Sequence, residues 1–145
     1  MKGYTMGYAR AWVLLGVMCF CSSTVLASTK LSIAPKKSKV QWVGKKVTGS
    51  HQGTVGIKTG YVEFEGAELI AAEIQIDMNT LECSDIKNPK WNKKLIKHLK
   101  NDDFFSVHKF PTATFVLSAS TKKTGSYRLE GQLTMKGQTH PIAFD

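Results

Sequence analysis

The sequence predicts a mainly β protein, in which a largely antiparallel sheet forms a barrel and one amphipathic helix covers an end. Apolar and polar residues alternate in most segments after Ser28, which is the period-2 signature of strands with one dry face. Apolar residues recur at helical spacing in one segment, residues 88–100. Because the sequence between most strands holds no helical crossover, neighbouring strands are expected to run antiparallel.

The first 27 residues have the features of a secretory signal peptide. Lys2 and Arg10 precede an apolar run over residues 11–20, and Val25–Ala27 supplies compact residues for a cleavage site. The run is shorter than the roughly 20 residues that a membrane span needs; the alternative is a retained interfacial anchor. We therefore expect cleavage after Ala27, a periplasmic or secreted bacterial protein, and one mature domain over residues 28–145.

Composition limits the partners and the covalent chemistry of this domain. The formal net charge is +9, and removal of Lys2 and Arg10 leaves about +7. An exported basic protein meets anionic membrane surface rather than nucleic acid. Cys83 is the only cysteine in residues 28–145, so the mature chain has no partner for an intramolecular disulfide and depends on packing.

The strand signature recurs along the whole mature chain. It is found in residues 39–43, 54–57, 61–65, 73–78, 113–117, 127–135 and 141–145. The last segment ends in phase at Asp145 without a turn, so we expect a barrel that is incomplete at its C-terminus and a chain that is a fragment. A barrel of about eight strands encloses either packed side chains or one ligand, and periodicity alone leaves both interpretations open.

The helical segment is basic as well as amphipathic. Asn88 followed by Pro89 matches an N-cap and a first-turn proline. Its lysine face is either simply solvated or docks on anionic membrane, where each lysine contributes about 1 kcal/mol. With the apolar stripe turned inward the helix closes a barrel end; the stripe consists of Trp91, Leu95, Ile96 and Leu99.

The run from His98 to Phe115 (HLKNDDFFSVHKFPTATF) resembles the signature of the YceI-like, polyisoprenoid-binding family. The resemblance covers residues 31–145 and includes the segment GQLTMKGQT at residues 131–139. It implies a lipocalin-like extended antiparallel β-barrel in the bacterial periplasm that holds an isoprenoid chain in its central tunnel. It names no catalytic residue and allows homodimers.

Together these features predict a protein that binds a long apolar lipid, a polyisoprenoid or an isoprenoid quinone, as a carrier, storage or stress-response protein. No cofactor other than this ligand is expected. His51, in a polar loop, is the candidate contact for a headgroup. The residues expected to line the lumen are Val40, Trp42, Val62, Phe64, Ile74, Ile76, Met78, Leu95, Leu99, Phe104, Phe105, Phe115, Leu117, Leu129 and Leu133.

Other chemistry finds little support in the sequence. It contains no Gly-rich phosphate loop, no zinc-type Cys and His pairing and no nucleophile elbow. His98 and Asp102 lie four residues apart, but a helix-end histidine is the commoner arrangement, so no metal is expected. The alternatives left open are an enzyme that uses His51 or His98 on an apolar substrate, and a structural or stress-response protein with a filled core.

Overall fold

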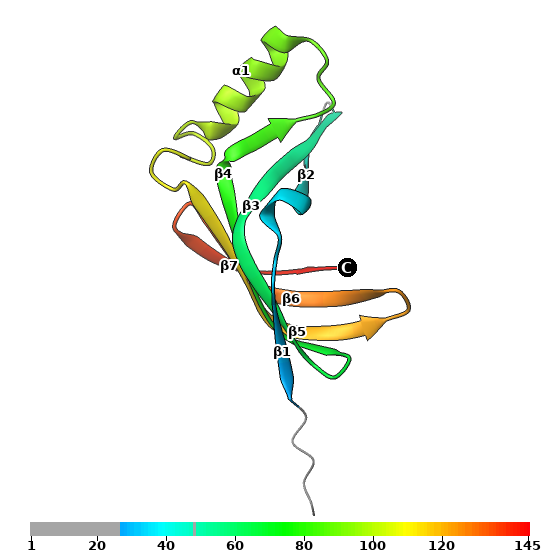
Figure 1. Ribbon diagram of the computed structural model, residues 1–145. Helices are drawn as coiled ribbons and strands as arrows, with labels where there is room; N and C mark the ends of the chain where they lie inside the picture. Colours follow the sequence, from blue (N-terminus) through cyan, green and yellow to red (C-terminus); the bar gives the residue numbers. More distant parts are fainter. Residues whose placement is uncertain (1–26, 48) are drawn as a thin grey trace, which may run out of the picture.

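Seven strands form one antiparallel sheet in the computed structural model, which describes residues 27–47 and 49–145 (Figure 1). Within the predicted signal peptide, residues 1–26 lie outside the described residues. The elements are β1 (Ser28–Ser32), a 3-10 turn η1 (Pro35–Lys37), β2 (Lys39–Lys46), β3 (Gly49–Glu65), β4 (Glu68–Cys83), α1 (Pro89–Lys100), β5 (Thr112–Lys123), β6 (Ser126–Met135) and β7 (Gln138–Phe144).

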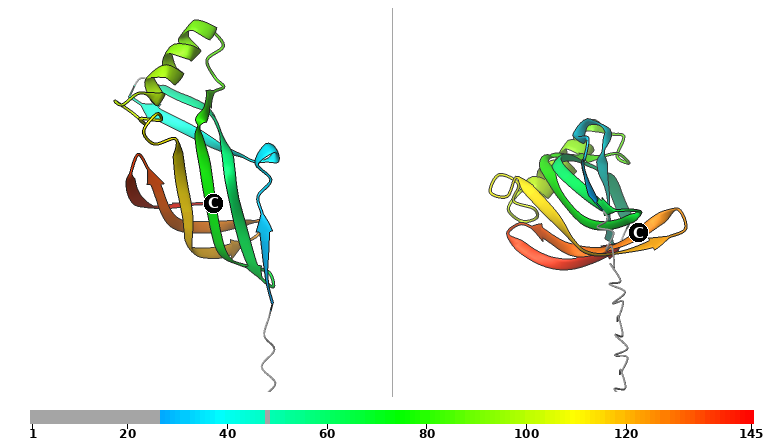
Figure 2. Two further views of the ribbon diagram at one scale, coloured as in Figure 1. Left: turned by 60° about the vertical axis from the view of Figure 1, so that its left-hand side comes forward. Right: turned by 60° about the horizontal axis from the view of Figure 1, so that its bottom comes forward.

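The sheet has the order β1-β3-β4-β5-β6-β7, and β2 also pairs with β3. Two short strands thus share one long neighbour: β1 pairs with Tyr61–Glu65 and β2 with Gly49–Gly56. All pairs are antiparallel, and the sheet is strongly curved, with α1 at one end of it (Figure 2). The predicted mainly β class with one amphipathic helix is confirmed. In the described part of the chain β7 forms one edge of the sheet and β1 and β2 form the other, and these edges do not pair with each other, so the sheet is open.

The strands are longer than the alternation indicated. Residues 54–57 and 61–65, predicted as two strands, belong to the single strand β3, and β4 extends well beyond the predicted segment 73–78. Register shifts against β4 occur between Thr54 and Gly56 and between Ile57 and Thr59. A bulge adds a residue without ending the pairing, so it breaks the apparent alternation while the strand continues.

Local sequence explains where α1 begins and ends. The Asn88 side chain accepts hydrogen bonds from the backbone N–H of Lys90 (3.0 Å) and Trp91 (3.3 Å), as an N-cap does. Pro89 occupies the first turn, where its missing N–H costs nothing. After the helix, Phe105 N–H donates to Leu99 O at 3.0 Å, which turns the chain back toward the sheet.

A compact apolar core joins α1 to the part of the sheet next to it. Leu99 is the buried residue of the helix, and Leu95 and Ile96 pack beside it. The turn after α1 contributes Val107, which is 3% exposed. The buried cluster consists of Val55, Ile76, Met78, Leu81, Leu99, Val107 and Ala113. The helix is therefore held by hydrophobic packing in addition to its N-cap.

Candidate ligand-binding pocket

An apolar pocket of about 290 Å³ lies between the curled sheet and the C-terminal end of α1. This volume is at the lower end of the range for small-molecule sites. None of the lining side chains is charged, so the pocket favours a hydrocarbon over a polar ligand. It is lined by Val40, Trp42, Val43, Gly44, Val55, Ile76, Met78, Leu81, Leu99, Phe104, Phe105, Leu133 and Met135.

Trp42 is placed in the wall of the pocket by a close approach of two strands. Its indole Nε1–H donates to the carbonyl oxygen of Glu82 at 3.0 Å, which satisfies the polar atom of an otherwise apolar side chain. Gly53 makes this possible, because a Cβ at this position would lie 1.8 Å from Glu82 O and 2.8 Å from the indole ring. The aromatic wall thus depends on a glycine in the neighbouring strand.

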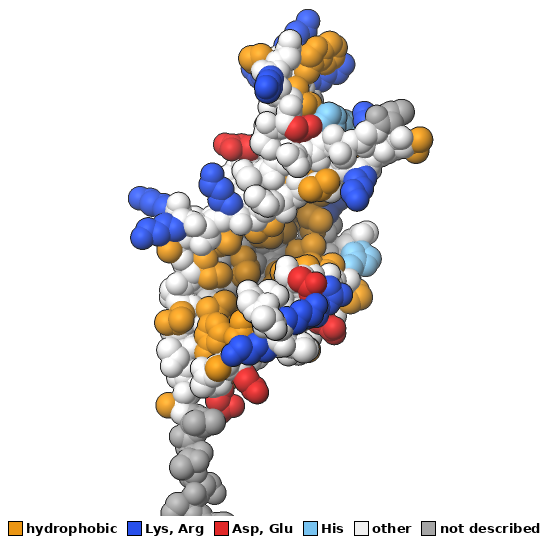
Figure 3. Space-filling model, turned by 90° about the vertical axis from the view of Figure 1, so that its right-hand side faces the viewer, with side chains coloured by type: hydrophobic (Ala, Val, Ile, Leu, Met, Phe, Trp, Pro, Cys, Tyr) orange, Lys and Arg blue, Asp and Glu red, His pale blue; other side chains and the backbone are white. Residues whose placement is uncertain are grey.

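The mouth of the pocket is formed by two exposed apolar side chains. Val43 of β2 is 59% exposed, and Phe104, in the turn after α1, is 45% exposed. Phe104 packs edge to face on Phe105, with ring centroids 4.6 Å apart. Figure 3 shows that hydrophobic side chains continue along the hollow of the sheet below the helix. An apolar chain longer than the pocket therefore finds further apolar surface at the opening.

Part of the predicted lumen lies in this pocket and part lies elsewhere. The pocket brings together Val40, Trp42, Ile76, Met78, Leu99, Phe104, Phe105 and Leu133. Leu95 borders a different pocket, and Ile74 packs against the core cluster. Phe64 contacts Tyr127, and Phe115 contacts Phe144, at ring-centroid distances of 6.4 and 5.3 Å. The predicted lumen residues outside the pocket are Val62, Phe64, Ile74, Leu95, Phe115, Leu117 and Leu129.

Several lining residues were not among the predicted ones. Met135 is in phase with Leu133, so the alternation of β6 could have identified it. Leu81 lies in the part of β4 that the sequence did not indicate as strand. Val43 is out of phase with Val40 and Trp42, and only its position at the pocket mouth reveals it.

A second, more polar pocket adjoins the apolar one and shares part of its wall. Phe104, Phe105, Leu133 and Met135 line both. The polar part of this pocket, of about 470 Å³, is formed by Asp103, Lys136, Gln138 and His140. Lys136 Nζ donates to Asp102 O at 2.8 Å, which holds the ammonium group beside the opening. An amphiphile with its chain in the apolar pocket would meet these groups with its polar end.

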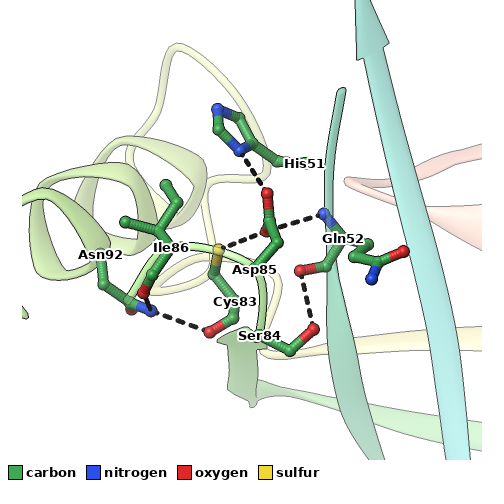
Figure 4. A network of polar contacts seen from close by, with 7 residues as sticks. All are labelled: His51, Gln52, Cys83, Ser84, Asp85, Ile86 and Asn92. Atoms are coloured by element: carbon green, nitrogen blue, oxygen red, sulfur yellow. Dashed lines mark hydrogen bonds and ion pairs between the residues drawn. The ribbon is translucent and has the colours of Figure 1, made fainter. Parts of the chain in front are cut away.

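His51 takes part in a different structure, a polar network that ties α1 to the sheet (Figure 4). Its Nδ1 lies 2.9 Å from Oδ2 of Asp85, and the backbone N–H of Gln52 donates to Oδ1 of the same carboxylate at 3.0 Å. Asn92 of α1 donates through Nδ2 to Cys83 O (2.8 Å) and to Ile86 O in the loop (3.0 Å). The loop between β4 and α1 is thereby fixed at both ends.

The charges in this network are set by its hydrogen bonds. The bond from Gln52 N–H, followed by those from His51 and Cys83, lowers the pKa of Asp85. Burial, followed by the hydrogen bond to Asp85, raises the pKa of the Cys83 thiol. Cys83 therefore carries its proton, donates through Sγ to Asp85 Oδ1 at 3.1 Å, and lacks the thiolate character of a nucleophile.

The two histidines of the enzyme alternative lie outside the apolar pocket. His51 and His98 both border a separate surface pocket, together with Trp91, Lys94 and Leu95. Asp102, considered as a metal partner of His98, instead accepts from Ser106 and Lys109, and these bonds lower its pKa. Residues 27–47 and 49–145 contain no group of three His, Cys, Asp or Glu side chains that could hold a metal ion.

As for membrane spans, none of the described helices combines sufficient length with sufficient hydropathy.

Comparison with known proteins identifies the family. The YceI-like domain model matches residues 31–145. A UPF0312 protein of Pseudomonas putida is 33% identical over an alignment of 105 residues that covers 66% of this chain and 50% of that protein. A UPF0312 protein of Shewanella denitrificans is 31% identical over 84 residues, 57% of this chain and 41% of that protein. The chain spans about half the length of these curated relatives, or less.

A solved structure shows the same fold. The crystal structure of Burkholderia cenocepacia BcnA aligns with a TM-score of 0.58 and 27% identity, over 77% of this chain and 67% of that one. The matching domain model, the relatives and the fold agree with one another, and the chain belongs to the YceI-like family.

Proposed function

We propose that this protein binds the apolar chain of a polyisoprenoid or isoprenoid quinone and carries or stores it in the bacterial periplasm. The observation that supports this is the apolar pocket beside α1, in a domain of a family with a generally polyisoprenoid-binding fold. The features of a signal peptide in residues 1–27 support export.

The energetics suit a reversible carrier. Removal of each methylene from water contributes about 0.8 kcal/mol, so a prenyl chain prefers the pocket strongly to water. Transfer from a bilayer to the pocket exchanges one apolar environment for another and is close to neutral. Loading and release therefore need no chemical step, which agrees with a pocket lined by no titratable side chain.

The adjoining polar pocket is the better candidate for the headgroup. Lys136 and His140 lie there, next to the shared wall of Phe104 and Phe105, and provide donors for a phosphate or a quinone carbonyl. The predicted headgroup contact, His51, borders neither pocket and has its Nδ1 beside Asp85. We therefore propose that Lys136 and His140 take this role.

Mass spectrometry of organic extracts tests the proposal. The protein is purified from a bacterial periplasm, and a stoichiometric isoprenoid lipid is expected in the extract. Leu133→Trp, which fills the pocket from a half-buried position, should remove most of this lipid, and so should Ile76→Trp if it folds. Val62→Trp is the matched control, because Val62 lies in the same sheet but outside the pocket.

One result would contradict the proposal. Folded protein that never contains lipid, with Leu133→Trp strongly destabilised, would show that the space is a packed core.

A further inference from the structure

Two basic segments lie together at the helical end of the molecule. The end of β2 and the exposed side of α1 are neighbours, because His51 of β3, beside β2, and His98 of α1 border one pocket. Neither β2 nor α1 contains an Asp or Glu. The exposed lysines at this end are Lys45 and Lys46, at the end of β2, and Lys90, Lys93, Lys94 and Lys97 in α1. This concentration of positive charge favours an anionic partner.

Large apolar side chains protrude among these lysines. Val47 directly follows Lys46 and is fully exposed, at 106%. Trp91 is 54% exposed in the first turn of α1, and Lys94 Nζ lies 5.3 Å from the centre of its ring. Figure 3 shows lysine and hydrophobic side chains intermixed at this end of the molecule. Tryptophan beside lysine is the combination found at the interface between hydrocarbon and water in membranes.

The same end holds the mouth of the apolar pocket. Val43, at the mouth, lies four residues before Val47 in the same hairpin. Phe104, the other exposed residue of the mouth, lies in the turn after α1. A surface that approached these lysines would therefore also approach the opening of the pocket.

Acidic groups interrupt this surface at few places. Asp85 accepts from Gln52 N–H and lies against His51, so its charge is largely engaged. Glu82 and Asp103 are exposed nearby and reduce the local positive charge without reversing it. The six exposed lysines at the end of β2 and in α1 outnumber these carboxylates.

We infer that this end, defined as Lys45–Val47, Lys90, Trp91, Lys94 and Phe104 and called the docking end below, binds the surface of an anionic lipid bilayer. The lysines would contact headgroup phosphates, and Val47 and Trp91 would enter the interface. This inference rests on the proposed function, since docking there places the pocket mouth at the membrane from which a lipid is taken.

The form of the surface favours a bilayer over an acidic protein. Val47 and Trp91 belong to different segments, and each has a lysine next to it, Lys46 in the sequence and Lys94 over the indole ring. A protein interface is usually built around a contiguous, uncharged core patch. A fluid headgroup layer accommodates isolated protrusions without matching their shape.

Co-sedimentation with vesicles tests the inference. The probes are phosphatidylcholine vesicles with roughly 30% phosphatidylglycerol and vesicles of phosphatidylcholine alone. The chain is expected to bind the first and not the second, and to be released at about 1 M salt, where the Debye length falls to about 3 Å. The wild type and all variants below have the same N-terminus, so any contribution of that end of the chain is constant.

The charge contribution is measured with two triple variants that remove equal charge. Lys45→Gln, Lys46→Gln and Lys94→Gln together should lower the vesicle partition coefficient by roughly 10- to 100-fold. In the control, Lys36→Gln, Lys37→Gln and Lys122→Gln remove the same charge from η1 and β5, and binding should be nearly unchanged. Equal losses of vesicle binding in the two triple variants would show that the docking end has no special role.

The apolar contribution has its own pair of variants. Val47→Asp should weaken binding several-fold, whereas Leu31→Asp, at a position 51% exposed in β1, should not. Lack of binding to either kind of vesicle would overturn the inference and would favour an acidic protein as the occupant. Bound lipid, measured by mass spectrometry in the same samples, separates this result from failure of the proposed cargo function.

Discussion

The rings of Phe104 and Phe105 meet edge to face at the mouth of the apolar pocket, with their planes at 85°. These two consecutive residues have different surroundings, since Phe105 packs against the core cluster and Phe104 is 45% exposed. Phe105 thus fixes the turn after α1 to the sheet, while Phe104 borders both the apolar pocket and the polar one. Phe104 is therefore placed to influence ligand binding with little effect on folding.

The first prediction concerns Phe104→Ala. The variant should bind the apolar fluorescent probe N-phenyl-1-naphthylamine roughly fivefold more weakly, because about 1 kcal/mol of ligand burial is lost. Its melting temperature should change little. Val116→Ala is the control, since Val116 is also 45% exposed but lies outside the pocket. Unchanged probe affinity in Phe104→Ala would mean that the mouth is elsewhere.

Gly53→Ala should destabilise the fold by more than about 2 kcal/mol, because the new Cβ clashes with backbone and with Trp42 rather than with a movable side-chain end. Urea denaturation measures the free energy of unfolding. Gly66→Ala provides the comparison: Gly66 has a φ of +59° but nothing within 4 Å of an added Cβ, so only about 1 kcal/mol of backbone strain is expected. A smaller loss of unfolding free energy for Gly53→Ala than for Gly66→Ala would contradict the close approach of Gly53 to Glu82 and Trp42.

Sequence patterns predicted the class of the fold because they depend on short-range periodicity. The helix at residues 88–100 was found within one residue, since its N-cap and its apolar stripe are both local signals. The lengths of β3 and β4 were not found, because the bulges near Gly56 that shift the alternation depend on how β3 pairs with β4, which the residue pattern of β3 alone does not reveal.

The site was predictable only in part for the same reason. Alternation assigns a residue to the inner or outer face of a strand, and Trp42 and Ile76 were assigned in this way. It cannot say how far along the strand the ligand space extends, so Phe64 and Phe115 could not be distinguished from them. The contact between His51 and Asp85, which are 34 residues apart in the chain, likewise follows from the three-dimensional fold alone.

Acid should destabilise the protein partly through Asp85. Its pKa lies below the ordinary value of about 3.9, so its contribution to stability is complete above that pH and is lost as the pH falls toward the folded-state pKa. Asp85→Asn should therefore lower the melting temperature at pH 7 and make its decline below about pH 4 less steep. Some decline should remain, because the pKa values of Asp102 and Asp145 are also lowered.

Thermal unfolding followed by circular dichroism at several pH values measures this effect. Asp103→Asn removes one charge at an exposed position and reports the effect of net charge alone. Parallel curves for the wild type and Asp85→Asn would show that the Asp85 network does not stabilise the fold.

Cys83 should be protected from thiol reagents as long as the protein is folded. The side chain is 8% exposed, its thiol donates to Asp85, and its pKa is raised, so the reactive thiolate is both scarce and covered. In a chain with Cys19→Ser and Cys21→Ser, reaction with 5,5′-dithiobis(2-nitrobenzoate) at about pH 8 should be more than about a hundredfold slower than in guanidinium. Asp85→Asn should accelerate the reaction of the folded chain, because the anionic acceptor that favours the protonated thiol is gone. A rate in native buffer equal to that of the unfolded chain would place Cys83 at the surface and remove the anchor inferred between β4 and α1.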